Sequence, residues 1–126
     1  MKIIAVGKIK KPWIKEGIQH YKKMLSQVKI EEIEIKDYKP IPIPAGYTVA
    51  LSEEGKTCTS TEFQKYLNNT TFIIGGAEGL PEKTKKQCDE ILSLSPMTFP
   101  HEIARLLLYE QIYRSHTIKQ GKKYHK

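Results

Sequence analysis

Short apolar segments rich in β-branched residues alternate with helical patterns along this chain, and this alternation is the strongest constraint on its fold. Residues 3–6 form an apolar segment closed by Gly7, which is typical of a strand buried on both faces. Pro12 then suits a first helical turn. The first 28 residues therefore predict a strand followed by an amphipathic helix. The apolar residues of that helix recur at spacings of three and four, at Ile14, Ile18, Tyr21, Leu25 and Val28.

The rest of the sequence repeats this order. Further strands are predicted over 30–35, 47–51, 71–74 and 91–94, and further helices over 60–66, 81–90 and 102–116. Because strands and helices alternate and no linker interrupts residues 1–126, we expect a single α/β domain. Its sheet should be mainly parallel with helices on both faces. In that class ligands bind beyond the carboxyl ends of strands, here in the loops after Leu51, Ile74 and Leu94.

The net charge of +7 is divided between two basic ends, while the middle of the chain is acidic. Residues 1–29 contain eight lysines and one acidic residue, and residues 114–126 contain five basic residues and no acidic one. Clustered positive charge is what neutralisation of a polyanion requires. A charged surface that serves only solubility would give the same pattern, so the charge leaves both interpretations open.

The apolar segments are too short to span a membrane, and the N-terminal one is interrupted by Lys8, Lys10 and Lys11, which is unlike a signal peptide. We therefore expect a cytoplasmic protein that does not enter a membrane. Cys58 and Cys88 are too few and too far apart for a disulfide framework or a zinc site. No structural metal is expected.

Three segments are candidates for chemistry, and each also has a purely structural explanation. Residues 75–80 contain three glycines, which suit either close approach to a ligand or a tight turn, and they match no P-loop or dinucleotide motif. Residues 94–101 combine two prolines with two hydroxyl groups, which suits an adenosine-like ligand or a rigid turn. The tail 120–126 ends in an aromatic ring, an imidazole and an ammonium group. Those groups suit stacking, proton transfer and phosphate binding, but they also suit a solvated tail.

Together these segments resemble the RlmH family of small methyltransferases. The matching positions are Gly75-Gly76, Gly79-Leu80, Leu94-Ser95, residues 97–101, Arg105, residues 110–114, Gly121 and the terminal Tyr124-His125-Lys126. RlmH proteins belong to the SPOUT class and methylate N3 of a pseudouridine in 23S ribosomal RNA of the large subunit, with S-adenosylmethionine as the methyl donor. The resemblance implies an α/β SPOUT fold with a C-terminal trefoil knot, working as a homodimer. It also implies cofactor contacts at Leu51, Gly75, Leu94, Ser95, Pro96, Met97, Thr98 and Phe99.

The chemistry of the implied reaction suggests further roles. Methyl transfer to a ring nitrogen requires alignment of the two reactants and removal of a proton, and His125 is our hypothesis for the base. Tyr124 would orient the target base, and Arg105 or Arg114 would stabilise charge on its carbonyls. The tail serves these roles only if it folds over a cofactor site, its own or that of a partner subunit. The expected RNA contacts are Lys8, Lys10, Lys11, Lys22, Lys23, Lys122, Lys123 and Lys126.

The chain departs from the family in residues 37–46, where three prolines replace a longer helical segment before the strand that ends at Leu51. That region lies outside the matching motifs, so we expect the cofactor site to survive. Two alternatives differ in function. One is a SPOUT methyltransferase that acts on another RNA such as transfer RNA, and the other is a ribosome- or RNA-binding module without catalysis.

Overall fold

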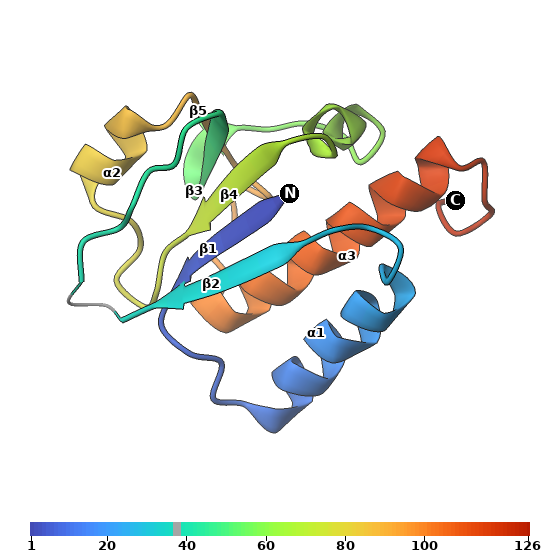
Figure 1. The fold of residues 1–126 in the computed structure, drawn as a ribbon, viewed down its shortest axis with the longest axis horizontal. Helices are drawn as coiled ribbons and strands as arrows, with labels where there is room; N and C mark the ends of the chain where they lie inside the picture. Colours follow the sequence, from blue (N-terminus) through green and yellow to red (C-terminus); the bar gives the residue numbers. More distant parts are fainter. Residues whose placement is uncertain (37–38) are drawn as a thin grey trace.

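A computed structural model describes residues 1–36 and 39–126, so Asp37 and Tyr38 of the predicted proline-rich connector lie outside the described residues. The described strands are β1 (Lys2–Val6), β2 (Glu31–Ile35), β3 (Tyr47–Lys56), β4 (Thr70–Ile74) and β5 (Glu90–Leu92). They form one sheet in the order β2-β1-β4-β3-β5, and every neighbouring pair is parallel (Figure 1). The predicted parallel sheet is therefore confirmed.

Helices lie on both faces of this sheet, as predicted. They are α1 (Pro12–Met24), α2 (Glu82–Gln87), α3 (His101–Lys119) and the 3-10 helix η1 (Glu62–Tyr66). Buried residues of α1, α3 and η1 share one hydrophobic cluster on the first face. On the second face, α2 and the extended segment around Ile41 and Ile43 cover a smaller cluster (Figure 1).

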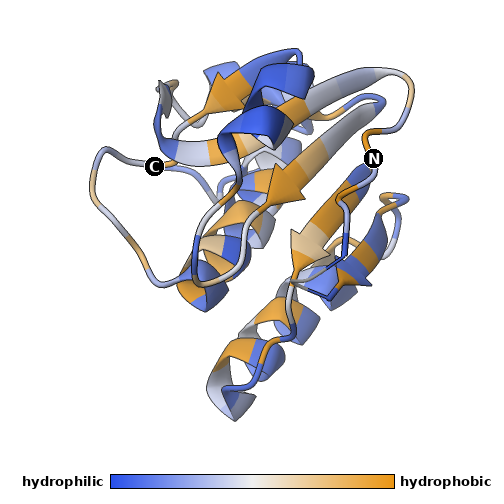
Figure 2. Ribbon diagram, turned by 90° about the vertical axis from the view of Figure 1, so that its left-hand side faces the viewer, coloured by the Kyte–Doolittle hydropathy of each residue, from blue (hydrophilic) through white to orange (hydrophobic). Residues whose placement is uncertain are grey.

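The two clusters arise from the two-residue period of the strands. Ile3 and Ala5 of β1 point toward α1 and α3, whereas Ile4 between them points to the other face, where Ile73 of β4 joins it. All four side chains are almost fully buried. Figure 2 shows the same pattern, with mostly hydrophobic central strands and helices that carry both hydrophobic and hydrophilic residues. The central strands are therefore apolar on both faces, as expected for a parallel sheet.

Helices α1 and α3 pack side by side and run in the same direction. A Cβ atom on Gly17 of α1 would lie 2.9 Å from the Leu106 side chain of α3, so the glycine permits a close approach of the two helices. Four residues further along α1, the Tyr21 ring lies 6.0 Å from the Tyr113 ring. A later residue of α1 thus contacts a later residue of α3, so the two helices are parallel. Each helix starts after the carboxyl end of a strand, and both N-termini therefore lie at the carboxyl edge of the sheet.

Several boundaries differ from the sequence prediction. Helix α2 ends at Gln87 rather than at residue 90, and β5 covers Glu90–Leu92 rather than residues 91–94. Strand β3 continues to Lys56 rather than ending at Leu51, because its pairing with β5 resumes beyond a register shift. The polar residues within that extension have low strand propensity and gave no signal. The predicted helix over 60–66 is a shorter 3-10 helix. Helix α3 extends to Lys119 and ends before Gly121, whose φ of +73° suits a helix terminus.

The order of the strands brings three loops together. After β4 the chain passes to the far side of β3 and forms β5 there, so the carboxyl ends of β4, β3 and β5 are neighbours. This arrangement fits a SPOUT fold, and the trefoil knot stays a prediction. In the described part of the chain, no helix combines the length and apolar character needed to cross a bilayer.

Candidate active site

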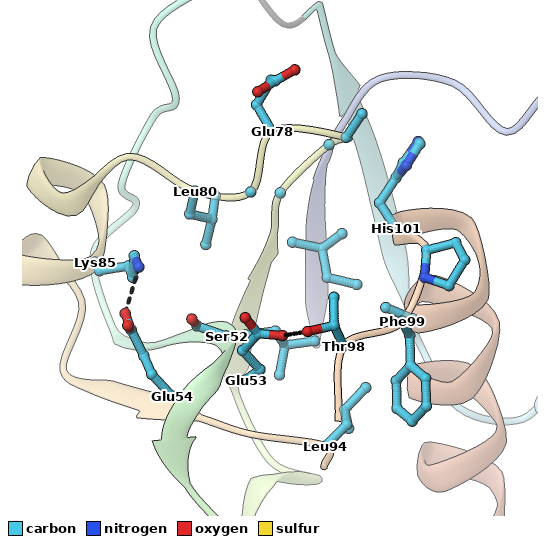
Figure 3. A pocket seen from close by; sticks show the side chains of 18 of the residues that line it. Ser52, Glu53, Glu54, Glu78, Leu80, Lys85, Leu94, Thr98, Phe99 and His101 are labelled. Carbon is cyan, nitrogen blue, oxygen red and sulfur yellow. Dashed lines mark hydrogen bonds and ion pairs between the residues drawn. The ribbon is translucent and has the colours of Figure 1, made fainter. Parts of the chain in front are cut away.

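A pocket of about 940 Å³ lies at the carboxyl edge of the sheet, between the second half of β3, the loops that follow β4 and β5, and the first turn of α3 (Figure 3). This volume suits a ligand the size of a nucleoside derivative. Seven of the eight residues predicted to contact a cofactor line it, and Pro96 is the exception. The seven are Leu51, Gly75, Leu94, Ser95, Met97, Thr98 and Phe99.

The glycine-rich loop after β4 is a tight turn that forms one wall of this pocket. The N–H of Gly79 donates to the Gly76 carbonyl at 2.9 Å, and Gly79 has a φ of +76°. A Cβ atom on Gly75 would lie 2.6 Å from the carbonyl carbon of Gly79. The sequence left two explanations of these glycines open, a tight turn and a loop at a ligand site. Both apply, because the tight turn is also a wall of the pocket.

Carboxylates that the sequence prediction missed dominate the charge of the pocket wall. Glu54 and Glu82 both contact Lys85, with Nζ–Oε1 distances of 2.5 and 2.8 Å. The hydrogen bond from Lys85 to Glu54, followed by that to Glu82, raises the pKa of Lys85. Glu53 and Glu78 also line the pocket. The pocket wall thus carries four carboxylates and one ammonium group. Its net negative charge favours a cationic ligand.

One of these carboxylates connects two walls of the pocket. Thr98 Oγ1 donates a hydrogen bond to Glu53 Oε2 and so joins the loop after β5 to the extension of β3 (Figure 3). Glu53 was not selected from the sequence, because the predicted strand ends at Leu51 and the polar residues after it suggest a loop. If β3 had been extended to Lys56, Glu53 would have been expected near Leu51 at the pocket.

The C-terminal tail folds back onto α3 at the opposite end of that helix. Tyr124 OH donates to Glu110 Oε2 at 2.9 Å, and its ring lies 4.7 Å from the Tyr113 ring. Arg114 Nη1 lies 3.2 Å from His125 Nδ1, and its Nη2 lies 2.9 Å from Glu110 Oε2. Burial, followed by hydrogen bonding that includes Glu110, raises the pKa of Tyr124. Three of the four predicted catalytic residues thus form one ordered cluster.

That cluster is distant from the pocket of its own chain. His101 lines the pocket, and Arg114 lies thirteen residues further along α3. At 1.5 Å per residue, the two positions are about 20 Å apart along the helix. The structure therefore brings Arg114, Tyr124 and His125 together but does not bring them to the predicted cofactor residues of the same chain.

Arg105, the fourth predicted catalytic residue, is buried rather than exposed to a substrate. Its side chain is 1% exposed, its Nη1 lies 2.6 Å from Glu34 Oε2, and its Nη2 donates to the Gly7 carbonyl at 2.9 Å. Its Nε has no hydrogen-bond partner among the described residues. Arg105 does not line the pocket, although its neighbour Ala104 does. The helix turns its guanidinium toward β1 and β2, where it joins these strands to α3.

The predicted RNA-contacting lysines separate into two groups. Lys8, Lys10 and Lys11 are exposed in the loop after β1, at the same edge of the sheet as the pocket. The other five lie toward the opposite end, in the last turn of α1 and in the tail, where Lys22 Nζ lies 3.4 Å from Glu32 Oε2. The second group is formed by Lys22, Lys23, Lys122, Lys123 and Lys126. The first group lies at the edge of the sheet that carries the pocket, but none of its three lysines lines the pocket.

Comparisons with known proteins agree with this geometry. A family model described as a predicted SPOUT methyltransferase matches residues 1–125. Proteins named ribosomal RNA large subunit methyltransferase H from Prochlorococcus marinus (strain NATL1A) and Synechococcus sp. (strain RCC307) are 48% and 41% identical to the chain. These matches cover 99% and 100% of this chain and 94% of each relative.

Solved structures resemble the fold at much lower identity. A probable methylase family protein from Haemophilus influenzae Rd KW20 has a TM-score of 0.61 at 9% identity, over 99% of this chain and 70% of that one. The SpoU methyltransferase AviRb from Streptomyces viridochromogenes, in complex with the cofactor AdoMet, has a TM-score of 0.58 at 13% identity, over 98% and 59%. Among the residues that the structure describes, no group of three or more His, Cys, Asp or Glu could hold a metal ion.

Proposed function

The chain belongs to the family of SPOUT methyltransferases and is a ribosomal RNA large subunit methyltransferase, and we propose that its target is N3 of a pseudouridine in 23S ribosomal RNA. The observation that carries this proposal is the pocket at the carboxyl edge of the sheet. Seven residues that the family resemblance selects for S-adenosylmethionine come from three separate loops and line that one cavity. A ribosomal RNA substrate also supports a cytoplasmic location.

The residues of the pocket fit S-adenosylmethionine. The cavity of about 940 Å³ is large enough for the whole cofactor. A Cβ atom at Gly75 would be 2.6 Å from Gly79, so glycine at this position permits the tight turn that forms one wall of the pocket. The carboxylates of the wall, including Glu53, suit the cationic sulfonium and ammonium groups. When bound, the cofactor supplies a methyl group that is already activated by its sulfonium leaving group.

The chain itself must orient the reactants and accept a proton. Leu51, Gly75 and the 94–99 loop hold the cofactor, and apolar side chains such as Phe99 exclude water from it. Tyr124 stacks on or orients the target base, and His125 removes the proton from N3. Arg114, which contacts His125 and lies 4.7 Å over the Tyr124 ring, stabilises negative charge on the pyrimidine.

These roles require two copies of the chain. The tail cluster and the pocket lie about 20 Å apart on one α3 helix, so a tail cannot reach its own pocket without leaving the contacts it makes with Glu110. A homodimer in which each tail approaches the pocket of its partner satisfies both requirements. It also brings the distant lysines, such as Lys22 and Lys122, to the edge where Lys8 and Lys11 already lie. A continuous basic surface for RNA then surrounds each site.

Methyl transfer to large ribosomal subunits that lack the modification, followed by mapping of the methylated nucleotide, tests this proposal. We expect one methyl group at N3 of one pseudouridine. Methylation of transfer RNA instead would favour the alternative SPOUT substrate. Calorimetry with S-adenosylmethionine separates the third possibility, because a binding module without catalysis would show no affinity for the cofactor.

A further inference from the structure

Trp13 is the single tryptophan of the chain, and it is unusually exposed for its size. Its relative exposure is 56%, although the adjacent Ile14 is completely buried. A large aromatic side chain in water indicates a binding surface when other groups of the same surface point to a ligand. None of the roles derived above uses Trp13.

The neighbours of Trp13 supply that second indication. Lys8, Lys10 and Lys11 are exposed in the loop that leads into α1. Within the described residues 1–36 and 39–126, none of these three ammonium groups forms an ion pair. Three unpaired cations beside an exposed indole match the composition of sites for single-stranded nucleic acids, where cations bind phosphates and aromatic rings stack on bases.

The loop that carries these groups is fixed at three points. Ile9 is buried in the main hydrophobic cluster. The Gly7 carbonyl accepts a hydrogen bond from Arg105 Nη2 at 2.9 Å. The backbone N–H groups of Lys10 and Lys11 both donate to Glu102 Oε1 at 3.1 Å, and Glu102 is 6% exposed. The lysines therefore project from an ordered backbone, which lowers the entropy lost when they bind.

Trp13 lies at the same edge of the sheet as the pocket. It is four residues before Gly17 and so shares a face of α1 with it, and Gly17 packs against Leu106 of α3. The first turn of α3, with His101, lines the pocket. Trp13 is therefore beside the N-terminus of α3, at the carboxyl edge of the sheet.

We propose that residues 7–13 form a preorganised docking element for single-stranded RNA, in which Trp13 stacks on an unpaired base next to the methylation target and Lys8, Lys10 and Lys11 bind the flanking phosphates. Glu102 and Arg105 act as positioning residues that hold this element against α3. The inference rests on the proposed function, because it takes the RNA substrate as given and assigns the element that grips it.

Trp13 gives a direct signal for the test, since it is the sole source of tryptophan fluorescence. We expect a short oligouridylate to quench the fluorescence of the full-length protein in a saturable manner. The affinities of the variants, which lack tryptophan, are measured by the fluorescence anisotropy of a dye-labelled oligouridylate. Trp13→Ala should weaken binding by about 5- to 150-fold, the loss of one base stack, and Trp13→Phe should restore most of the lost affinity. Tyr47→Ala is the matched control, because Tyr47 is 46% exposed at the opposite end of the sheet and should not affect binding.

Salt dependence separates stacking from charge. Replacing Lys8, Lys10 and Lys11 by alanine should lower the slope of log affinity against log salt by about 2, at about 0.7 per phosphate on a single strand. Trp13→Ala should leave that slope unchanged. Equal slopes for wild type and the triple variant would overturn the assignment of the lysines.

Two further measurements on the same samples keep this inference separate from the proposed function. If the wild type methylates ribosomal RNA but oligouridylate causes no quenching, the docking element is wrong and the proposed function stands. If the wild type binds no S-adenosylmethionine in calorimetry, the proposed function itself fails. Sedimentation of Trp13→Ala covers the remaining outcome, because dissociation of a dimer would show that Trp13 is an interface residue and would overturn the inference.

Discussion

Glu102 Oε1 accepts a hydrogen bond from the backbone N–H of Lys11 at 3.1 Å, although the two residues are 91 positions apart in the sequence. Lys10 donates to the same oxygen at the same distance. This buried carboxylate therefore joins the N-terminal basic loop to the helix that lines the pocket. Neither partner is unusual in the sequence, and only the fold brings them together.

Replacing Glu102 by alanine should lower the free energy of unfolding by about 1.5 to 3 kcal/mol at neutral pH, the value of hydrogen bonds to a charged group. Urea denaturation measures this. Glu16→Ala, at an exposed position of α1, is the control and should have little effect. A Glu102 variant as stable as the wild type would mean that the two hydrogen bonds contribute nothing net.

The same carboxylate predicts a pH dependence. Burial would raise the pKa of Glu102, but the hydrogen bonds from Lys11 and Lys10 outweigh burial and hold that pKa below its ordinary value. A lowered folded-state pKa adds stability above the unfolded-state value of about 4.3, and that stability disappears as the pH falls through the folded-state pKa. The stability difference between wild type and Glu102→Ala should therefore shrink below about pH 4, as measured by urea denaturation at several pH values.

Replacing Arg105 by alanine should cost about 2 to 4 kcal/mol of stability, because its 1% exposed side chain joins Glu34 and the Gly7 carbonyl to α3. Loss of methyl transfer should then follow the fraction of unfolded protein. A discriminating variant is Arg105→Lys, measured well below its melting temperature. If that variant is folded and binds S-adenosylmethionine normally yet transfers no methyl group, Arg105 acts on the substrate directly.

Gly75→Ala should reduce the affinity for S-adenosylmethionine by at least about tenfold, since its Cβ would lie 2.6 Å from Gly79 and push the loop into the pocket. Calorimetry measures the dissociation constant. Gly17→Ala is the matched control, because its Cβ meets the flexible end of the Leu106 side chain at 2.9 Å, away from the pocket. It should change stability and leave cofactor affinity unchanged. Equal effects of both variants on binding would remove the special role of Gly75.

Mixing two impaired variants, at a concentration of S-adenosylmethionine too low to load Gly75→Ala, tests whether the tail acts across a dimer. Co-expression of His125→Ala with Gly75→Ala creates mixed dimers in which one site has an intact pocket and an intact tail. If the tail acts on the partner pocket, about a quarter of wild-type methyl transfer should return in a random mixture. A tail that acts on its own pocket would give no recovery, because each chain would then carry either a defective pocket or a defective tail.

The element pattern of the sequence was sufficient for most of the fold. Strands recognised from β-branched apolar segments, such as residues 71–74, are buried on both faces, and this pattern does not depend on distant partners. The extension of β3 to Lys56 was not predictable in this way. Its residues are polar and become a strand only because β5 pairs with them after the chain has returned from β4.

Seven of the eight predicted cofactor residues line one pocket, because they lie where the rule for parallel sheets and the family motifs agree. Their contact with the cofactor stays a prediction. The carboxylates of the pocket wall were missed, since Glu53 belongs to the unexpected part of β3. The catalytic role of Arg105 stays a prediction. Its burial against Glu34 and the Gly7 carbonyl was not predictable, because the direction of its side chain depends on how α3 packs against β1 and β2, which no local pattern contains.

By itself, the sequence determined the kind of fold, the three chain segments that line the pocket and the basic character of both ends, because each depends on local periodicity, glycine and proline positions or charge. Only the tertiary structure decided which of these parts meet. Residues far apart in sequence, such as Glu102 and Lys11, become partners when β1 and α3 pack together. Residues close on one helix, such as His101 and Arg114, are kept about 20 Å apart by the straight rise of α3, which assigns them to different sites.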